Sequence, residues 1–320
     1  MTRKNKGGME MGSQNEQQSG IMYAAIAYIL WGFLPFYWKL LDRVGAEEIL
    51  ANRVLWSFLF ILLLLFLSKK WPLFIKTIQG FATNKRQLLA LVIASVLISI
   101  NWFVYIWGVN SGQMVETSLG YYINPLVSVL LGVIFFNEKL SHAQIVSFIL
   151  ATVGVLIMTA SYGSFPWIAI TLAVTFGLYG MAKKLIKMDS AVGLALETMV
   201  MTPIAALYMW WFIGSDNMII AGNWGMSLLL IGAGAATAIP LLLFAKGAQR
   251  IPLSTLGFLQ YIAPTIMLFL GIFVYHETFS KSDLLAFIFI WSALSIYSVS
   301  KTKLATNLEM KFRKEKSTHI

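Results

Sequence analysis

The sequence has no cysteine and few charged residues. Of its 320 residues 12% are charged, and the three histidines, His142, His276 and His319, lie far apart. Without cysteine there are no disulfides, thiolate metal ligands or cysteine nucleophiles, and the scattered histidines form no metal-binding pattern. We therefore expect no metal and no cofactor. A charged fraction about half of the usual ~25% also excludes an ordinary soluble surface.

Apolar residues make up 58% of the chain and recur in long runs. A helix of ~20 mostly apolar residues crosses the hydrocarbon core of a bilayer, and it satisfies its own backbone hydrogen bonds there. The sequence therefore predicts an all-α polytopic membrane protein with a lipid bilayer around it. Its ten transmembrane helices are expected at about 21–40, 49–68, 88–109, 117–136, 142–160, 165–183, 191–213, 225–245, 253–275 and 282–300. Ser141 with Gln144, and Ser280 with Asp283, have the spacing of helix N-caps at the fifth and tenth of these.

The basic residues indicate how the chain is oriented. If the N-terminus is cytoplasmic, twenty of the 24 lysines and arginines lie in cytoplasmic segments and three lie outside. Such a bias predicts that both termini are cytoplasmic. Residues 1–20 are polar and predict a disordered tail, and residues 302–320 predict a basic tail. The net charge of +10 is thus explained by topology, and we expect no nucleic-acid partner.

The chain also contains an internal repeat. At an offset of 139 residues, Tyr122 and Pro125 fall on Tyr261 and Pro264, and Glu138 and Ser141 fall on Glu277 and Ser280. This predicts two five-helix repeats, residues 21–160 and 165–301. Because five is odd, the second repeat enters the membrane from the opposite side, so the repeats are inverted. Inverted repeats are typical of secondary transporters, whose substrate site lies near the midplane between the halves.

Several segments resemble the RarD group of EamA-type transporters, within the drug/metabolite transporter superfamily. The resemblance covers about residues 20–300 and is carried by Tyr28–Gly32 (YILWG), Glu48–Ser57 (EILANRVLWS), Asn101–Trp102, Ser118–Leu126 (SLGYYINPL) and Ser254–Pro264 (STLGFLQYIAP). It implies a ten-helix permease of the bacterial inner membrane. The group carries a chloramphenicol-sensitivity label, but the resemblance fixes no transported compound.

These features favour a secondary transporter that moves a small organic metabolite or drug-like compound by alternating access. The sequence has no Gly-rich phosphate loop, no His-Glu-x-x-His motif and no paired intramembrane aspartates, so we expect neither an ATPase nor an intramembrane enzyme. The alternative is a non-transporting membrane adaptor or sensor. Neither the substrate nor the oligomeric state follows from the sequence.

Charged residues inside the spans are candidates for coupling or gating, because a charge at the bilayer centre costs ~2.5–3.5 kcal/mol on insertion scales. Glu197, Lys183 and Lys184 are expected together near the inner ends of their spans, as candidates for coupling or for an inner gate. The alternative for Glu197 is a structural partnership with Lys183 or Lys184. Arg53 and Lys39 are expected at the outer end, either at a gate or snorkelling to the interface. Because the repeats are inverted, we expect no ion pair between Arg53 and Glu197.

Uncharged polar and aromatic residues are candidates for lining the substrate cavity. Pro125 and Pro264 are expected to bend their helices, and Tyr122 and Tyr261 precede them by three residues. The other candidates are Trp31, Asn101, Trp102, Tyr105, Asn124 and Gln260. For the amides the alternative is hydrogen bonding between helices. Trp38 is expected to anchor the chain at the membrane interface.

Overall fold

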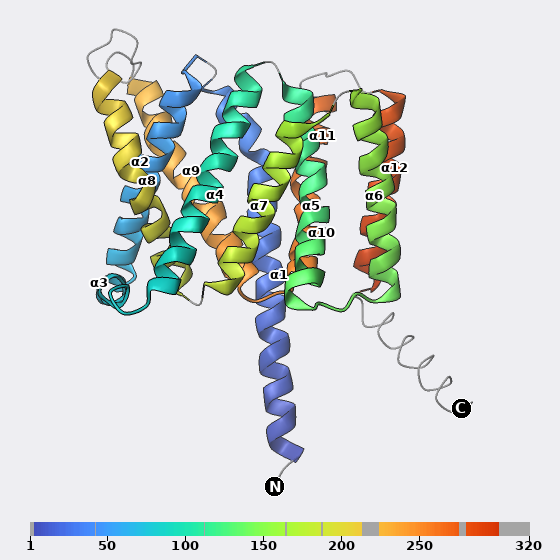
Figure 1. Ribbon diagram of the computed structural model, residues 1–320, viewed down its shortest axis with the longest axis horizontal. Helices are drawn as coiled ribbons and strands as arrows, with labels where there is room; N and C mark the ends of the chain where they lie inside the picture. The colour runs from blue at the N-terminus through green and yellow to red at the C-terminus, as the bar shows by residue number, and fades with distance from the viewer. Residues whose placement is uncertain are drawn as a thin grey trace.

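The computed structural model describes residues 3–41, 43–111, 113–163, 165–186, 188–212, 224–274 and 280–300, and the regular elements in these ranges are helices (Figure 1). They are α1 (Arg3–Lys39), α2 (Ala46–Leu67), α3 (Trp71–Gly80), α4 (Lys85–Asn110), α5 (Met114–Phe136), α6 (His142–Tyr162), α7 (Trp167–Leu185), α8 (Ser190–Phe212), α9 (Trp224–Ala248), α10 (Leu253–Gln260), α11 (Ile262–Phe273) and α12 (Lys281–Ser300).

Ten membrane spans are present in the described part of the chain, each long and apolar enough to cross a bilayer. Nine are single helices, and the ninth in chain order is built from α10 and α11 together. Many large apolar side chains on the outside of the bundle are exposed, among them Phe66, Phe103 and Leu207, as expected where lipid takes the place of water. The predicted all-α polytopic fold with ten spans is confirmed.

The local signals at two helix starts are confirmed as well. Ser141 accepts a hydrogen bond from the Gln144 amide, and the Gln144 side chain accepts one from the Ser141 amide, which completes a capping box at α6. Ser280 and Asp283 exchange the equivalent bonds at the start of α12. Each box satisfies backbone donors that the first turn of a helix leaves without partners.

The amino-terminal segment differs from its prediction. Residues 3–20 continue α1 as a helix that projects beyond the bundle, where the sequence predicts a disordered tail (Figure 1). A helix already formed within the membrane extends without a new nucleation step, so weak helix formers can join it. The predicted basic tail, 302–320, lies outside the described residues.

Helix α3 is an element that the sequence prediction lacks. It has only 10 residues, so it cannot span a bilayer, and it links α2 to α4 on the side where α1 begins (Figure 1). Phe74 is its buried residue, while the basic Lys76 is exposed. An apolar face of this kind beside a polar one suits a helix that lies along the membrane surface.

The two halves of the chain, α1–α6 and α7–α12, contact each other in matched pairs. The predicted repeat pairs α1 with α7, α2 with α8, α4 with α9, and α5 with α10 and α11. On this pairing, the contact of α1 with α9 matches that of α7 with α4, and the contact of α2 with α9 matches that of α8 with α4. The contact of α5 with α7 likewise matches that of α10 and α11 with α1. Three further pairs join helices that the predicted repeat makes equivalent: α2 with α8, α5 with α10, and α6 with α12. The surface helix α3, which has no equivalent in the second half, also contacts α8. Helices α6 and α12 form one end of the bundle, and α2 and α8 the other (Figure 1).

Candidate functional site

A cavity of about 110 Å³ lies between the two halves. Helices α1, α2, α4 and α5 of the first half and α7, α9, α10 and α11 of the second contribute to its wall. The lining is mainly aromatic and apolar, with a few polar side chains: Tyr28, Trp31, Leu34, Pro35, Trp38, Arg53, Asn101, Trp102, Tyr105, Gly120, Tyr121, Asn124, Leu172, Phe176, Thr237, Leu241, Gln260, Ala263, Pro264 and Met267. A concave apolar site with few polar groups is the usual form of a small-molecule site.

The cavity is displaced toward the membrane side opposite the start of the chain. Successive spans alternate in direction, and α1 contributes its second half to the wall while α5 contributes its first. On the other side, Tyr28, Trp31 and Phe176 form the floor, with Phe244 and Tyr179 packed behind them at 0% exposure. Their ring centroids are 5.3–6.2 Å apart. The cavity is therefore closed on one side by a packed aromatic cluster.

Arg53 is the charged residue of the cavity wall. Its Nε donates a hydrogen bond of 3.0 Å to the Thr237 hydroxyl, which joins α2 to α9 across the two halves. Its Cζ lies 4.6 Å from the ring centroid of Trp38 and 5.0 Å from that of Trp102, both within cation–π range. Trp38 thus lines the cavity beside Arg53, where the sequence analysis expects an interface anchor.

Three amide side chains reach the cavity. The Asn101 amide donates to the Leu172 carbonyl at 2.9 Å and to the Thr175 hydroxyl at 3.0 Å, which ties α4 to α7. The Gln260 carbonyl oxygen accepts from the Ser128 hydroxyl at 2.9 Å. Asn124 is only 7% exposed, and its Oδ1 has no hydrogen-bond partner. Two of the three amides therefore bind neighbouring helices, and the third has a free acceptor in the wall.

Six of the eight expected cavity residues line the cavity, and Tyr122 and Tyr261 do not. These two pack against α6 and α12, and their hydroxyls donate to the carbonyls of Pro264 and Tyr122, each at 3.3 Å. Tyr121 occupies the wall instead, with its ring 5.8 Å from that of Tyr105. The spacing of residues along the helix could have indicated that Tyr121, rather than Tyr122, lines the cavity. Tyr121 lies three residues before Asn124 and shares its helix face, whereas Tyr122 lies two residues before it and does not.

The two prolines behave differently. Pro264 lines the cavity in the first turn of α11, just after the ninth span breaks at Tyr261. A proline at this position cannot donate to the Gln260 carbonyl, so a break one turn earlier is the expected consequence. Pro125 lies inside α5, which continues through it. The expected helix bend therefore coincides with an interruption only at Pro264.

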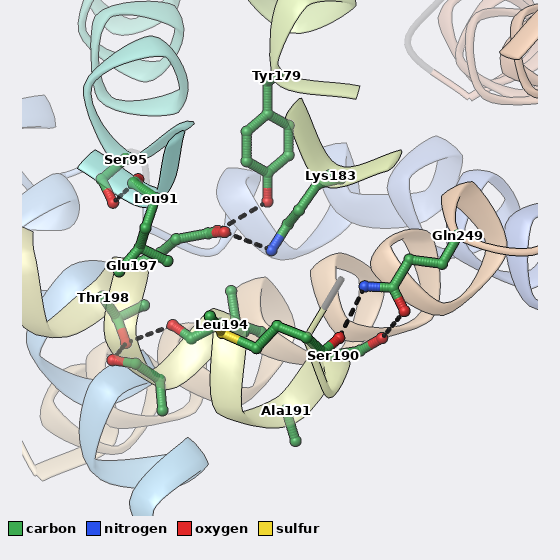
Figure 2. A network of polar contacts seen from close by, with 12 residues as sticks. Leu91, Ser95, Tyr179, Lys183, Ser190, Ala191, Leu194, Glu197, Thr198 and Gln249 are labelled. Atoms are coloured by element: carbon green, nitrogen blue, oxygen red, sulfur yellow. Dashed lines mark hydrogen bonds and ion pairs between the residues drawn. The ribbon is translucent and has the colours of Figure 1, made fainter. Parts of the chain in front are cut away.

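Glu197 belongs to a buried network on the closed side of the bundle (Figure 2). Its Oε1 lies 2.6 Å from Lys183 Nζ, and its Oε2 accepts from the Tyr179 hydroxyl at 3.2 Å. Both charged side chains are 3% exposed. This is the structural partnership with Lys183 that the sequence analysis weighs against a coupling role, and Arg53 takes no part in it. A small pocket beside Glu197 shares Trp102 and Leu241 with the wall of the cavity.

The other candidate gate residues lie at the ends of spans. Lys184 donates to the Ile251 carbonyl at 2.6 Å and lies 3.7 Å from a Glu138 oxygen. The Glu138 carboxylate also accepts from the amides of Leu253 and Ser254 at the start of α10, so it joins the halves on the closed side. Lys39 is exposed in the last turn of α1. Glu277, the repeat equivalent of Glu138, lies outside the described residues.

In the described part of the chain, ten apolar spans surround a mainly aromatic cavity that is closed on one side, which is the architecture of a multi-pass membrane permease. The sequence profile of the EamA-like transporter family matches residues 18–160 and again 165–299, and the chain belongs to this family.

Similar proteins agree with this assignment. Over 288 residues the chain is 50% identical to "Uncharacterized transporter YojE" of Bacillus subtilis, covering 90% of this chain and 96% of that one. Over 283 residues it is 41% identical to "Protein RarD" of Escherichia coli, covering 88% and 94%. A solved crystal structure with 17% sequence identity has the same fold at a TM-score of 0.65, covering 90% of this chain and 99% of that one. The chain is a membrane transporter of the RarD type.

Proposed function

We propose that this transporter is a secondary transporter that moves a small organic compound across the bacterial inner membrane by alternating access. The observation that carries the proposal is the cavity between the halves. Both halves line it, and packed aromatic side chains close it on one side. A site of this kind changes the side to which it opens if the halves move relative to each other.

The proposed inverted repeat provides the geometry for that movement. Among the membrane-spanning helices, the main pairs that join the halves each have a counterpart with the roles of the halves exchanged, or join two helices that the predicted repeat makes equivalent. The hydroxyls of Tyr122 and Tyr261, which the predicted repeat pairs, also both donate across the contact between the halves, to the carbonyls of Pro264 and Tyr122. An arrangement related by a two-fold axis in the membrane plane has a second conformation of nearly equal energy, in which each half adopts the conformation of the other.

The orientation follows from the basic residues. With the start of α1 on the cytoplasmic side, twenty lysines and arginines are cytoplasmic, and so are both termini. The cavity then lies in the periplasmic half of the membrane and the aromatic floor in the cytoplasmic half. The described conformation is therefore assigned as closed toward the cytoplasm. The ion pair of Lys183 with Glu197, and the contacts of Glu138 and Lys184 with the start of α10, are assigned to the cytoplasmic gate.

Cysteine labelling tests both the orientation and the alternation, because the natural chain has no cysteine. Three matched alanine-to-cysteine variants are compared in right-side-out and inverted membrane vesicles with a membrane-impermeant maleimide. Ala263 lines the cavity, Ala24 is buried at 0% exposure on the closed side, and Ala82 is exposed after α3.

We expect Ala263→Cys to react from the periplasmic side and Ala82→Cys to react rapidly from the cytoplasmic side. Ala24→Cys should react from the cytoplasmic side as well, but slowly, because it is exposed only when the halves rearrange. Reaction of Ala82→Cys from the periplasmic side would overturn the orientation. Complete protection of Ala24→Cys on both sides would argue against alternation. A metabolite profile of cells with and without the gene then identifies the transported compound, and an unchanged profile would favour an adaptor or sensor.

A further inference from the structure

The geometry points to a small organic anion as the ligand of the cavity, with its carboxylate bound by the Arg53 guanidinium and its apolar body against the aromatic wall. As a statement about cargo, this inference rests on the proposed transport function. As a statement about binding, it stands on the cavity alone.

Charge is the first argument. Among the twenty lining residues Arg53 is the only charged one, and no ion pair recorded among the described residues includes it. A positive charge in a low-dielectric site is costly unless an anion or strong hydrogen-bond acceptors balance it. The carboxylate of Glu197 does not supply this balance, because Lys183 pairs with it behind the cavity floor. A ligand carboxylate would provide the missing negative charge.

The way Arg53 is held is the second argument. Nε is occupied by Thr237, while the two terminal nitrogens make no hydrogen bond to any described residue. Together these nitrogens form the planar end of the guanidinium, which binds a carboxylate through two parallel hydrogen bonds. Trp38 and Trp102 contact the guanidinium and limit its rotation. The side chain is therefore held in one orientation by α1, α4 and α9 before a ligand arrives, which lowers the entropic cost of binding.

An unpartnered polar atom in the wall gives the third argument. Asn124 Oδ1 is buried and has no hydrogen-bond partner. Buried polar groups without partners are rare in folded proteins, and a ligand is one reason for them. Asn124 Oδ1 can accept a hydrogen bond, so it suits a donor on the body of the anion. A volume of about 110 Å³ limits that body to the size of a single ring or a short branched chain.

A cationic or neutral ligand fits these features less well. A cation in the cavity would meet the charge of Arg53, and the described lining contains no carboxylate to attract it. A neutral amide could bind the guanidinium through one oxygen only, without a charge of its own. The order of preference is therefore carboxylate, then amide, then amine.

The test measures binding with two matched series of probes. One is benzoate, benzamide and benzylamine, and the other is 3-methylbutanoate, 3-methylbutanamide and 3-methylbutylamine. Each is added at millimolar concentrations, at neutral pH, to the purified full-length protein in detergent. Affinity is taken from the rise in unfolding temperature with probe concentration, since a ligand that binds only the folded state stabilises it in proportion to RT ln(1 + [L]/Kd).

Three variants separate a ligand-binding arginine from a structural one. Arg53→Gln removes the charge, and Arg53→Lys keeps the charge but loses the planar pair of donors. Arg86→Gln is the matched control, because Arg86 is exposed at the start of α4. We expect carboxylates to bind the parent and the control alike, and to bind Arg53→Gln about 10- to 150-fold more weakly. Arg53→Lys should show an intermediate loss, while the weak binding of the amides stays the same.

The inference is overturned if an amine or an amide binds the parent as tightly as its carboxylate, or if no carboxylate binds at millimolar concentration. It is also overturned if Arg53→Gln keeps the preference for carboxylates. Should Arg53→Gln fail to fold, Arg53→Lys decides, and unchanged carboxylate affinity there counts against the inference. Uptake of the binding carboxylate into proteoliposomes separates the two proposals. Binding without uptake refutes its transport, whereas uptake of the amine alone refutes the anion site and supports transport.

Discussion

The buried ion pair of Lys183 and Glu197 makes a quantitative prediction when it is compared with the exposed pair of Lys70 and Asp189. The two pairs have nearly equal separations, 2.6 Å and 2.5 Å between nitrogen and oxygen. Their exposure differs, with side chains 3% and 3% exposed in the first pair and 38% and 26% in the second. If the separation alone set the energy, both pairs would contribute equally to the free energy of unfolding. We expect instead that burial determines how much stability is lost when one partner of a pair is removed.

Glu197→Gln leaves the Lys183 ammonium in an apolar surrounding without its counter-charge. Breaking a buried pair in this way costs about 3–5 kcal/mol. Asp189→Asn removes the charge of a solvated pair, which contributes about 0–1 kcal/mol. The double variant Lys183→Met with Glu197→Gln removes both buried charges, so no unpaired charge remains, and it should be more stable than either single variant.

Thermal unfolding of the purified variants in detergent, followed by tryptophan fluorescence at neutral pH, measures these differences. We expect the parent and Asp189→Asn to have the highest unfolding temperatures and the double variant to come next. The single variants Glu197→Gln and Lys183→Met should have the lowest. If Glu197→Gln unfolds at the same temperature as Asp189→Asn, burial does not determine the energy of the pair. A double variant that loses the sum of the two single losses would likewise refute the reasoning.

Two further predictions concern packing and pH. Gly234→Ala should destabilise strongly, because its Cβ would lie 2.4 Å from the Trp56 backbone, whereas Gly80→Ala meets nothing within 4 Å and should be neutral or slightly stabilising in the same unfolding assay. Burial raises the pKa of the Asp189 carboxyl, but the Lys70 hydrogen bond and two amides at the start of α8 outweigh it and hold the pKa below its usual value. This stabilisation is present above the usual pKa of an aspartate and is lost as the pH falls below about 4. Asp189→Asn should therefore lose less stability on acidification than the parent does. Equal losses in the two proteins would contradict this prediction.

The spans could be predicted from the sequence because their signal is local. Each needs ~20 apolar residues in a row, whatever the other helices do, and the chain supplies ten such runs. The capping boxes at Ser141 and Ser280 are also local, since their partners lie three residues away. Helix α3 is absent from the sequence prediction because it has only 10 residues, and the criterion of ~20 apolar residues in a row detects spanning helices alone.

The candidate site could be predicted only in part. Hydrophobicity and polarity indicate that Asn101, Asn124 and Gln260 need partners, but not which of them bind neighbouring helices and which keeps a free acceptor in the cavity wall. Tyr121 and Tyr122 are neighbours with the same side chain, and only the rotation of α5 within the bundle places the first in the wall and the second against α6 and α12. The spacing of residues on the helix shows that only one of the two tyrosines shares a face with Asn124, and the packing of α5 determines that this face lines the cavity.

The sequence by itself determined the fold class, the number of spans and the family, because composition, apolar run length and extended similarity do not depend on how helices meet. The tertiary structure alone decided the surroundings of the charges. It placed Arg53 beside Trp38, Trp102 and Thr237, which come from three other helices, and it paired Glu197 with Lys183. The energy of a charge in a membrane protein depends on what surrounds it within a few ångströms, and residues distant in sequence supply those neighbours.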